Sequence, residues 1–169
     1  MEVFGVKLPV DRGLTDVELV GYAQRDLKIP YFRGVYMRDS LPRGGVLSHE
    51  CGIMNFNKST QPGSHWVCYY RDPHHKIYFD SFGQITPMEI QKYLKTPREL
   101  EMGVGVIERN TDIVQHINSH VCGQLCLFVL TALSREHRTF QSVIQALGDS
   151  SGCGYGCAQG YREVADQTT

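Results

Sequence analysis

Four side chains, in the chain order His65, Asp80, Gln115 and Cys122, are of the types that nucleophilic catalysis uses. A cysteine can attack a carbonyl carbon, a histidine can accept its proton, and a carboxylate can orient the imidazole. A glutamine amide can donate a hydrogen bond to the oxyanion that forms. Each residue taken alone has a more ordinary structural explanation, so the fold around them decides whether they act together.

Cys122 opens the most apolar segment of the chain, Cys-Gly-Gln-Leu-Cys-Leu-Phe-Val-Leu. This segment predicts a central buried helix over residues 122–137 with Cys122 at its start. Unpaired backbone N–H groups and the helix dipole stabilise a thiolate there, which makes a cysteine a better nucleophile. Gly123 would let a substrate approach the backbone closely. The alternative for an isolated cysteine is simple packing in the core.

His65 lies at the start of one strand-like run, and Asp80 lies at the end of the next. The turn between the two runs, residues 72–75, predicts a hairpin, which makes a His65–Asp80 pair geometrically reasonable. A carboxylate at the end of an apolar strand is costly unless it has a partner, and the imidazole would supply one. Asp72 is the competing carboxylate, but it belongs to the turn and is expected to be solvated.

Two further residues could contribute to a substrate site. Trp66 is the only tryptophan in the chain and directly follows His65. It could line a cleft, although a core position is equally common for a large aromatic residue. Gln115 precedes Cys122 by seven residues, and its amide could form an oxyanion hole together with the Cys122 backbone N–H. The alternative for a lone loop glutamine is a solvent-facing side chain.

The chain has six cysteines, of which Cys122 and Cys126 form one i, i+4 pair and Cys153 and Cys157 another. Four such sulfurs could hold a zinc ion, but the spacing is not the CxxC of zinc ribbons, and Cys126 lies on an apolar helix. We therefore expect no metal site. Disulfides are not expected either, because the chain shows no secretory signal and reducing compartments keep thiols free. Redox control by the Gly-rich Cys153–Cys157 pair is a separate hypothesis.

The remaining elements follow from hydrophobic periodicity and from the signals at element ends. Thr15 and Glu18 form a capping box, and Thr86 is expected to cap a second helix that Pro87 opens. Residues 31–45 contain Pro and Gly and indicate a connecting loop. The predicted helices are residues 15–28, 86–95, 122–137 and 140–147, and the predicted strands are residues 51–57, 65–71, 76–80 and 104–108.

This order of elements predicts the α+β class, with a mostly antiparallel sheet packed on a central helix that carries the nucleophile at its N-terminus. The length of 169 residues suits one domain over residues 1–169, with a flexible tail from about residue 150. Apolar residues make up 41% and charged residues 21% of the chain, as in an ordinary globular protein.

The chain contains 17 Lys and Arg and 18 Asp and Glu, a net charge of −1. This balance gives no global attraction to nucleic acid or to anionic membranes. No apolar run approaches the roughly 20 residues of a membrane helix, and the N-terminus lacks a signal sequence. We therefore expect a soluble intracellular protein that is monomeric.

The ordered set of motifs resembles the adenovirus protease family, adenain, and the wider clan that includes the ubiquitin-like-protein proteases. The likeness covers about residues 15–135 and includes the Pro-Tyr-Phe-x-Gly-x-Tyr segment at residues 30–36. Its order, with His before Cys, differs from that of papain-like enzymes. The motifs that carry it are His65-Trp66, the block Phe79-Asp80-x-Phe82-Gly83, and Gln115-x6-Cys122-Gly123 at the start of an apolar helix.

The resemblance implies a role for each of these residues. Cys122 attacks the scissile carbonyl, His65 accepts and returns the proton, and Asp80 holds the imidazole in the right tautomer. Gln115 helps to form the oxyanion hole, and Trp66 lines a narrow channel for small substrate residues. The implied protein is a viral endopeptidase that cleaves capsid or core precursors at Gly-containing sites, in the host nucleus and in the virion.

Adenain-like enzymes also use two activators, a capsid-derived peptide held by a disulfide and viral DNA. Val104 stands where the family has the cysteine for that disulfide, and this chain is near neutral where adenain is strongly basic. The resemblance therefore leaves an activating peptide or DNA open, while these two departures argue against both. The sequence itself shows no need for a cofactor. The chain also lacks adenain's longer C-terminal helical region, which favours a relative outside the mammalian adenoviruses.

Two other functions remain open at this level. One is removal of ubiquitin or a ubiquitin-like modifier from other proteins, an activity of the same clan. The other is a non-catalytic binding domain that retains the fold. The intact set of His65, Asp80, Gln115 and Cys122 argues against the second, because a pseudoenzyme usually loses at least one such residue.

Overall fold

The computed structural model describes residues 1–61 and 64–151. In chain order the elements are β1 (Glu2–Val3), β2 (Val6–Lys7), α1 (Asp16–Gly21), η1 (Tyr22–Asp26), β3 (Phe32–Met37), β4 (Glu50–Asn55), β5 (Trp66–Arg71), β6 (Lys76–Phe79), α2 (Met88–Leu94), α3 (Pro97–Met102), β7 (Glu108–Arg109), α4 (Cys122–Leu130), η2 (Thr131–Arg135) and α5 (Phe140–Ser151). The segments η1 and η2 are π-helical continuations of α1 and α4. The predicted α+β class is confirmed.

The main sheet has five strands in the order β3-β4-β5-β6-β7. Its three central strands are antiparallel, whereas β3 runs parallel to β4 and β7 runs parallel to β6. The sheet is therefore mixed, and the predicted antiparallel arrangement holds for its centre only. Parallel neighbours need a crossover connection, which residues 38–49 supply at one edge and residues 80–107 at the other.

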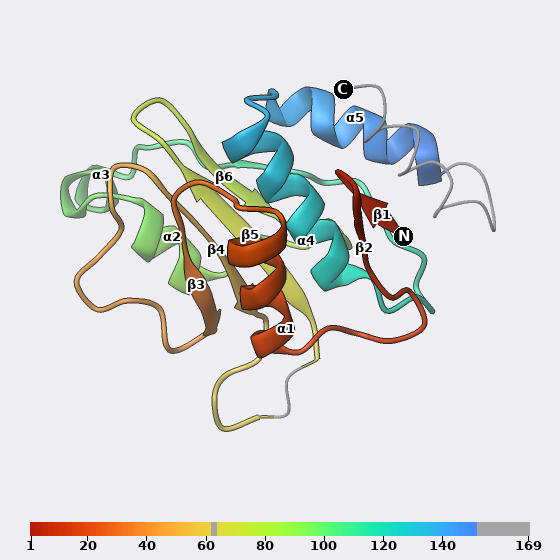
Figure 1. The fold of residues 1–169 in the computed structure, drawn as a ribbon. Helices are drawn as coiled ribbons and strands as arrows, with labels where there is room; N and C mark the ends of the chain where they lie inside the picture. Colours follow the sequence, from red (N-terminus) through yellow and green to blue (C-terminus); the bar gives the residue numbers. More distant parts are fainter. Residues whose placement is uncertain (62–63, 152–169) are drawn as a thin grey trace.

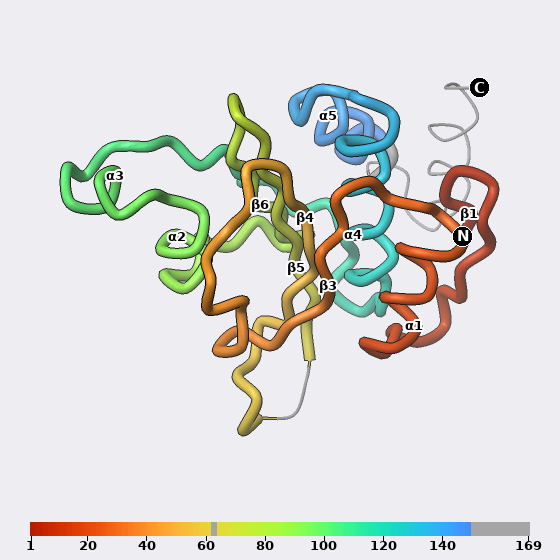
Figure 2. The backbone as a smooth tube through the Cα atoms, turned by 60° about the vertical axis from the view of Figure 1, so that its left-hand side comes forward, coloured from red at the N-terminus to blue at the C-terminus, as the bar shows by residue number. Residues whose placement is uncertain are grey.

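Two groups of helices cover the two faces of the sheet (Figure 2). The helices α1, α4 and α5 lie on one face with the larger hydrophobic cluster, and α2 and α3 lie on the other with the smaller one. Side chains alternate between these faces along each strand, so that Cys68 of β5 belongs to the larger cluster and Tyr69 to the smaller. The β1–β2 pair and α5 lie against α4 (Figure 1).

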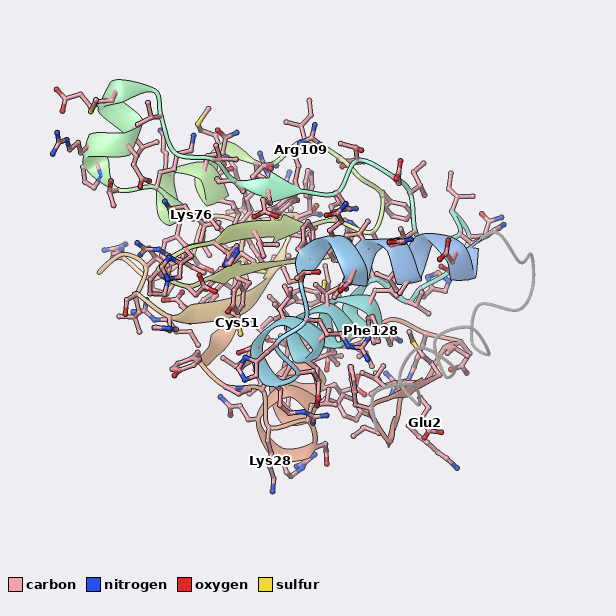
Figure 3. The ribbon with its side chains drawn as sticks, turned by 90° about the horizontal axis from the view of Figure 1, so that it is seen from above. Glu2, Lys28, Cys51, Lys76, Arg109 and Phe128 are labelled. Carbon is pink, nitrogen blue, oxygen red and sulfur yellow. The ribbon has the colours of Figure 1, made fainter. Side chains whose placement is uncertain are left out.

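Helix α4 is buried along its whole length against the sheet. Figure 3 shows Phe128 of α4 and Cys51 of β4, which both belong to the larger cluster. On the other side of the sheet, Lys76 lies near α3, where its ammonium group binds the Glu99 carboxylate at 2.8 Å. No helix in the described part of the chain is long and apolar enough to cross a membrane.

Most helix predictions are confirmed at their starts. The Thr15 capping box is present, with the Thr15 hydroxyl accepting from the Glu18 N–H and the Glu18 carboxylate accepting in return. The helix predicted over residues 122–137 begins at Cys122 and continues through η2 to Arg135. The helix predicted over residues 140–147 begins at Phe140 and extends to Ser151.

Three predictions of local structure are wrong, and one helix was not predicted. Residues 31–45 contain the strand β3 instead of being loop throughout, and the strand predicted at 104–108 is absent except at Glu108, where β7 begins. Thr86 does not cap α2, because Pro87 occupies the N-cap position and no side chain caps the helix. Helix α3 was missed, although Thr96 forms the same capping box as Thr15.

Part of the predicted chain cannot be compared with this structure. The tail expected from about residue 150, together with Cys153 and Cys157, lies almost entirely outside the described residues. The single domain over residues 1–169 and the redox hypothesis for this cysteine pair therefore remain predictions.

Candidate active site

The predicted site residues meet at one cleft, between the start of β5 and the start of α4. The cleft has a volume of about 870 Å³, and His65, Trp66, Gln115 and Cys122 all line it. Asp80 lies behind His65, away from the opening. The sheet produces this meeting point, because β5 and β6 are antiparallel with Cys68 opposite Phe79, so His65 and Asp80 come to the same end of these two strands.

His65 and Asp80 form a close pair. Nε2 of His65 lies 2.8 Å from Oδ1 of Asp80, and the same oxygen accepts the backbone N–H of Phe82 at 2.8 Å. The Asp80 side chain is fully buried, and within the described residues its second oxygen, Oδ2, has no hydrogen-bond partner. Because only one oxygen of this buried carboxylate has hydrogen-bond partners, the pairing with His65 is the main interaction that stabilises its negative charge.

The Asp80–Gly83 turn holds the carboxylate and the imidazole in place. The Gly83 N–H donates to the Asp80 carbonyl at 2.8 Å, and the Gly83 φ of 65° lies in the left-handed region that favours glycine. A Cβ on Gly83 would also lie only 2.4 Å from the Thr111 carbonyl oxygen. The turn places the Phe82 ring against the His65 ring, with centroids 4.9 Å apart.

The charged state of His65 is favoured by its neighbours. Burial of the ring lowers its pKa, but hydrogen bonds to Asp80 and to Cys122, together with their negative charges, outweigh burial and raise the pKa to about 9. Because Nε2 faces Asp80, the proton of the neutral ring is held at Nε2, and Nδ1 is the nitrogen left for the thiol. This is the arrangement of a base whose tautomer a carboxylate selects.

Cys122 combines limited access with electrostatic support. Its residue surface is 7% exposed, and its sulfur lines the cleft. The backbone N–H of Trp66 donates to Sγ at 3.5 Å. Val121, the N-cap residue of α4, makes no side-chain cap, so the first N–H groups of the helix keep their positive potential next to the sulfur. The Trp66 N–H and the start of α4 therefore place a hydrogen-bond donor and positive potential beside the Cys122 sulfur.

Gln115 is buried beside Cys122, and its amide has one defined orientation. The Ser119 carbonyl can only accept a hydrogen bond, so the Gln115 atom 2.9 Å from it must be the nitrogen Nε2. Oε1 therefore faces Ser81, whose hydroxyl donates to it at 2.5 Å. One N–H of the amide donates to the Ser119 carbonyl, and within the described residues the second N–H has no hydrogen-bond partner. Ser81 is fully buried and was not singled out from the sequence.

Trp66 forms part of the cleft wall and is held from behind. Its indole N–H donates to the Leu14 carbonyl at 2.8 Å, which joins the strand β5 to the segment before α1. Gly123 has a packing reason for lacking a side chain, because a Cβ there would lie 3.2 Å from both Leu19 and Trp66. Close approach of a substrate to the Gly123 backbone remains a prediction.

Gln124 is a second residue that the sequence did not single out. It is fully buried on α4, and its amide nitrogen donates to the Pro9 carbonyl at 2.7 Å and to the Arg12 carbonyl at 3.2 Å. These bonds fasten the N-terminal segment to the nucleophile helix. The adjoining residues 13–16 line the cleft, so Gln124 positions one of its walls. An isolated glutamine in an apolar helix is a weak signal, because its partners are distant in sequence.

Comparisons with known proteins place few constraints on this chain. No protein-family model matches the sequence, and a search of curated proteins finds no match. Among solved structures, the fold is similar to a selenomethionine crystal structure of the ASFV pS273R protease, with a TM-score of 0.45 and 20% sequence identity. The match covers 57% of this chain and 38% of that one, well under two thirds of its length. A likeness at this level identifies no family.

Cys126, one turn after Cys122, is a different kind of cysteine. It is fully buried, and burial together with the neighbouring Cys68 raises its pKa well above the usual thiol range. Within the described residues the four cysteines are free thiols, and no group of three or more His, Cys, Asp or Glu could hold a metal ion. The zinc hypothesis also involves Cys153 and Cys157, which lie outside these residues.

Proposed function

We propose that this chain is a cysteine endopeptidase with Cys122 as nucleophile, His65 as general base and Asp80 as the group that orients the imidazole. One observation carries the proposal: a single histidine ring bonds a buried carboxylate through Nε2 and faces a helix-start cysteine through its other nitrogen, beside a cleft. This is the nucleophile, base and orienter arrangement of covalent acyl transfer.

The proposed reaction starts with transfer of the Cys122 thiol proton to Nδ1 of His65. The sulfur then attacks the scissile carbonyl carbon, and the carbonyl oxygen becomes an oxyanion. The free N–H of Gln115 and the backbone N–H of Cys122 would donate hydrogen bonds to that oxygen, supported by the positive end of α4. Donors fixed in this way stabilise the oxyanion more than the planar carbonyl of the substrate.

Collapse of the tetrahedral intermediate breaks the C–N bond and leaves a thioester on Cys122. His65 gives its proton to the departing amine nitrogen. It then accepts a proton from a water molecule that attacks the thioester, and the acid product leaves with the thiol restored. All of these proton transfers use groups of the chain and water, so the proposed reaction requires no cofactor.

The proposed substrates are polypeptides cut next to small residues. The cleft beside Cys122 is bounded by Trp66, and Leu14 supports that wall, which suits Gly near the cut. The motif resemblance further leads us to propose a viral enzyme that matures capsid or core precursors in the host nucleus and virion. Because Val104 replaces the family cysteine and the net charge is −1, we propose that no activating peptide or DNA is required.

The direct test compares cleavage of a Gly-containing fluorogenic peptide by wild type, Cys122→Ala and Cys126→Ala. We expect Cys122→Ala to lower kcat/KM by roughly 10⁴-fold or more, because the covalent route is lost. Cys126→Ala should keep most of the activity, since its sulfur lies outside the cleft. Circular dichroism confirms that each variant is folded.

Three additional experiments test for activators, for deconjugation of ubiquitin-like modifiers and for a non-catalytic role. Peptide and DNA activators are added to separate reactions, and neither should raise the rate. A panel of ubiquitin-like-modifier fusions tests deconjugation, and preferential cleavage of the fusions would replace the endopeptidase assignment. Full activity in Cys122→Ala would remove Cys122 as the nucleophile. No cleavage by the wild type, together with no labelling of Cys122 by a peptide vinyl sulfone, would show that the fold is used for binding instead.

A further inference from the structure

A second groove lies on the opposite face of the sheet from α4. It has a volume of about 690 Å³ and runs between the loop after β3 and the helices α2 and α3. Figure 2 shows this loop and the two helices on the same side of the sheet, away from α1 and α4. The groove shares no lining residue with the catalytic cleft, and none of the proposed catalytic steps uses it.

A buried carboxylate ties the two walls of this groove together. Glu50 is 1% exposed and accepts hydrogen bonds from the hydroxyls of Tyr69 and Tyr93, from Arg33 at 2.8 Å and from the Leu47 N–H at 3.0 Å. Tyr93 belongs to α2, whereas Leu47 directly follows Val46, the last lining residue of the loop. The same Arg33 nitrogen also donates to the Gly45 carbonyl at 2.7 Å. The groove is therefore preformed rather than a gap that packing could close.

The anionic side chains of the groove already have partners. Five cationic and two anionic side chains line it. The Glu89 carboxylate accepts from Nε of Arg38 at 2.9 Å, and the Asp39 carboxylate accepts from the hydroxyl of Ser59 at 2.7 Å and from its N–H at 2.8 Å. Neither carboxylate neutralises the remaining cations by direct contact.

Three cations are left over on the two walls. Arg43 lies on the loop, and Lys92 and Lys95 lie at the end of α2; within residues 1–61 and 64–151 none of them forms an ion pair. Arg71 adds a fourth positive charge, and one of its guanidinium nitrogens donates a hydrogen bond to the Leu47 carbonyl. The groove is thus strongly positive in a chain whose net charge is −1, which attracts an anionic ligand.

The rest of the lining favours a peptide over a nucleic acid. Leu41, Pro42, Val46 and Leu100 supply apolar surface between the cations. Single-stranded nucleic acids bind largely by stacking bases on exposed aromatic rings. Among the described residues that line the groove, Tyr93 is the only aromatic one; it is 9% exposed and donates its hydroxyl proton to Glu50. Apolar side chains alternating with carboxylates would match such a lining.

We propose that this groove binds an acidic polypeptide segment that also carries apolar side chains. Carboxylates of the segment would lie against Arg43 on one wall and against Lys92 and Lys95 on the other, with its apolar side chains between them. The binding does not depend on proteolysis, because the groove and the catalytic cleft are separate.

The test measures binding of a fluorescein-labelled peptide of alternating Glu and Leu to the full-length Cys122→Ala protein by fluorescence anisotropy. This variant removes cleavage of the probe as a complication. We expect saturable binding that weakens as salt is raised, since exposed charges are screened. Reversing one cation on each wall, with Arg43→Glu and Lys92→Glu together, should weaken binding by about tenfold.

Two controls accompany the reversal. Lys7→Glu combined with Arg25→Glu makes the same change in net charge away from the groove and should leave the affinity unchanged. Arg43→Gln with Lys92→Gln neutralises the charges, should weaken binding less than reversal does, and separates a charge effect from a folding defect, which thermal melting also monitors. A labelled Lys–Leu peptide and a single-stranded oligonucleotide complete the probes, and neither should bind.

Several results would overturn the proposal. These are no binding of the Glu–Leu peptide, equal loss in the Lys7 and Arg25 control, or binding of the oligonucleotide in place of the peptide. Since the assay contains no turnover, its outcome is independent of whether Cys122 is a catalytic nucleophile.

Discussion

Cys122 and Cys126 lie one helical turn apart on α4, in equally apolar sequence, yet they occupy different chemical environments. Cys122 is at the helix start, faces the cleft and receives the Trp66 N–H and the His65 ring. Cys126 is fully buried against the sheet, and burial raises its pKa well above the usual range. The comparison teaches that position relative to a helix start and to strand ends, rather than local sequence, separates a thiol that lines a cleft from one that is enclosed in the core.

The difference arises from what the sheet brings to each sulfur. The start of β5 places the His65 ring next to Cys122, and the end of β6 places the Asp80 carboxylate behind that ring, because the two strands are antiparallel. Further along the sheet, apolar side chains and the Cys68 thiol of β5 surround Cys126. Each of the following predictions concerns one group near these cysteines. It states whether the effect is confined to the start of α4.

Among the changes to the surroundings of Cys122, Asp80→Asn has the largest expected effect. The amide cannot stabilise the imidazolium and can hold the ring in the wrong tautomer, so kcat/KM should fall on the order of 10³-fold. Peptide hydrolysis measures the loss, and the burial of Cys126 should not change. An Asp72→Asn variant is the matched control, because Asp72 pairs with His75 in an exposed turn. Near-normal activity in Asp80→Asn would remove Asp80 from the mechanism.

Alkylation rates compare the two cysteines directly. Iodoacetamide should modify Cys122 in the native protein at least about 10²-fold faster than Cys126, because only Cys122 is both accessible and electrostatically supported. Mass spectrometry of the digested protein resolves the two sites, and His65→Gln should slow Cys122 alone. In denaturant the two rates should converge. Equal rates in the native state would contradict the comparison.

The His65 ring should also link stability to pH. Its pKa is about 9 in the folded protein and about 6.5 in the unfolded chain, so its contribution is fully present below pH 6.5. That contribution is lost as the pH rises through about 9 and amounts to roughly 2–3 kcal/mol. The measurement is the free energy of unfolding of wild type minus that of His65→Gln at several pH values. A difference that does not vary between pH 6 and pH 10 would disprove the linkage.

The smallest expected effect is that of Ser81→Ala. Loss of its hydrogen bond frees the Gln115 amide to rotate, so kcat should fall by about fivefold with little change in KM. In a Gln115→Ala background the same change should have no effect on kcat, which distinguishes positioning of the amide from a general structural defect. Ser142→Ala on the surface of α5 is the control. Additive losses in the double variant would remove Ser81 from this role.

Local sequence signals predicted a substantial part of the fold. Local preferences for helix or strand, which need few distant contacts, predicted several elements. These are the helix that starts with the Thr15 capping box, the apolar helix from Cys122 and the strands β4 to β6. The same local reasoning failed for Thr86, because Pro87 took the N-cap position. It also failed for β3. That strand is half-buried along its length, so no periodic pattern of apolar residues predicts it, and it forms its hydrogen bonds with β4, which follows only after a crossover connection.

The sequence likewise predicted only part of the candidate site. His65, Asp80, Gln115 and Cys122 could be picked out as candidates because their chemical types and order resemble a known arrangement. Ser81 and Gln124 could not, because their partners lie 34 and 112 to 115 residues away along the chain. Their function depends on hydrogen bonds that only the folded chain forms.

The sequence by itself determined that an apolar helix would start at Cys122 and that the candidate partners would lie near strand ends. Helix starts and strand runs are local properties, so a single sequence can encode them visibly. Only the tertiary structure decided that the His65 ring bonds Asp80, that Ser81 orients Gln115 and that Cys126 is sealed from the cleft. Those outcomes depend on strand pairing and close packing over long sequence separations, which bring together groups that no local pattern relates.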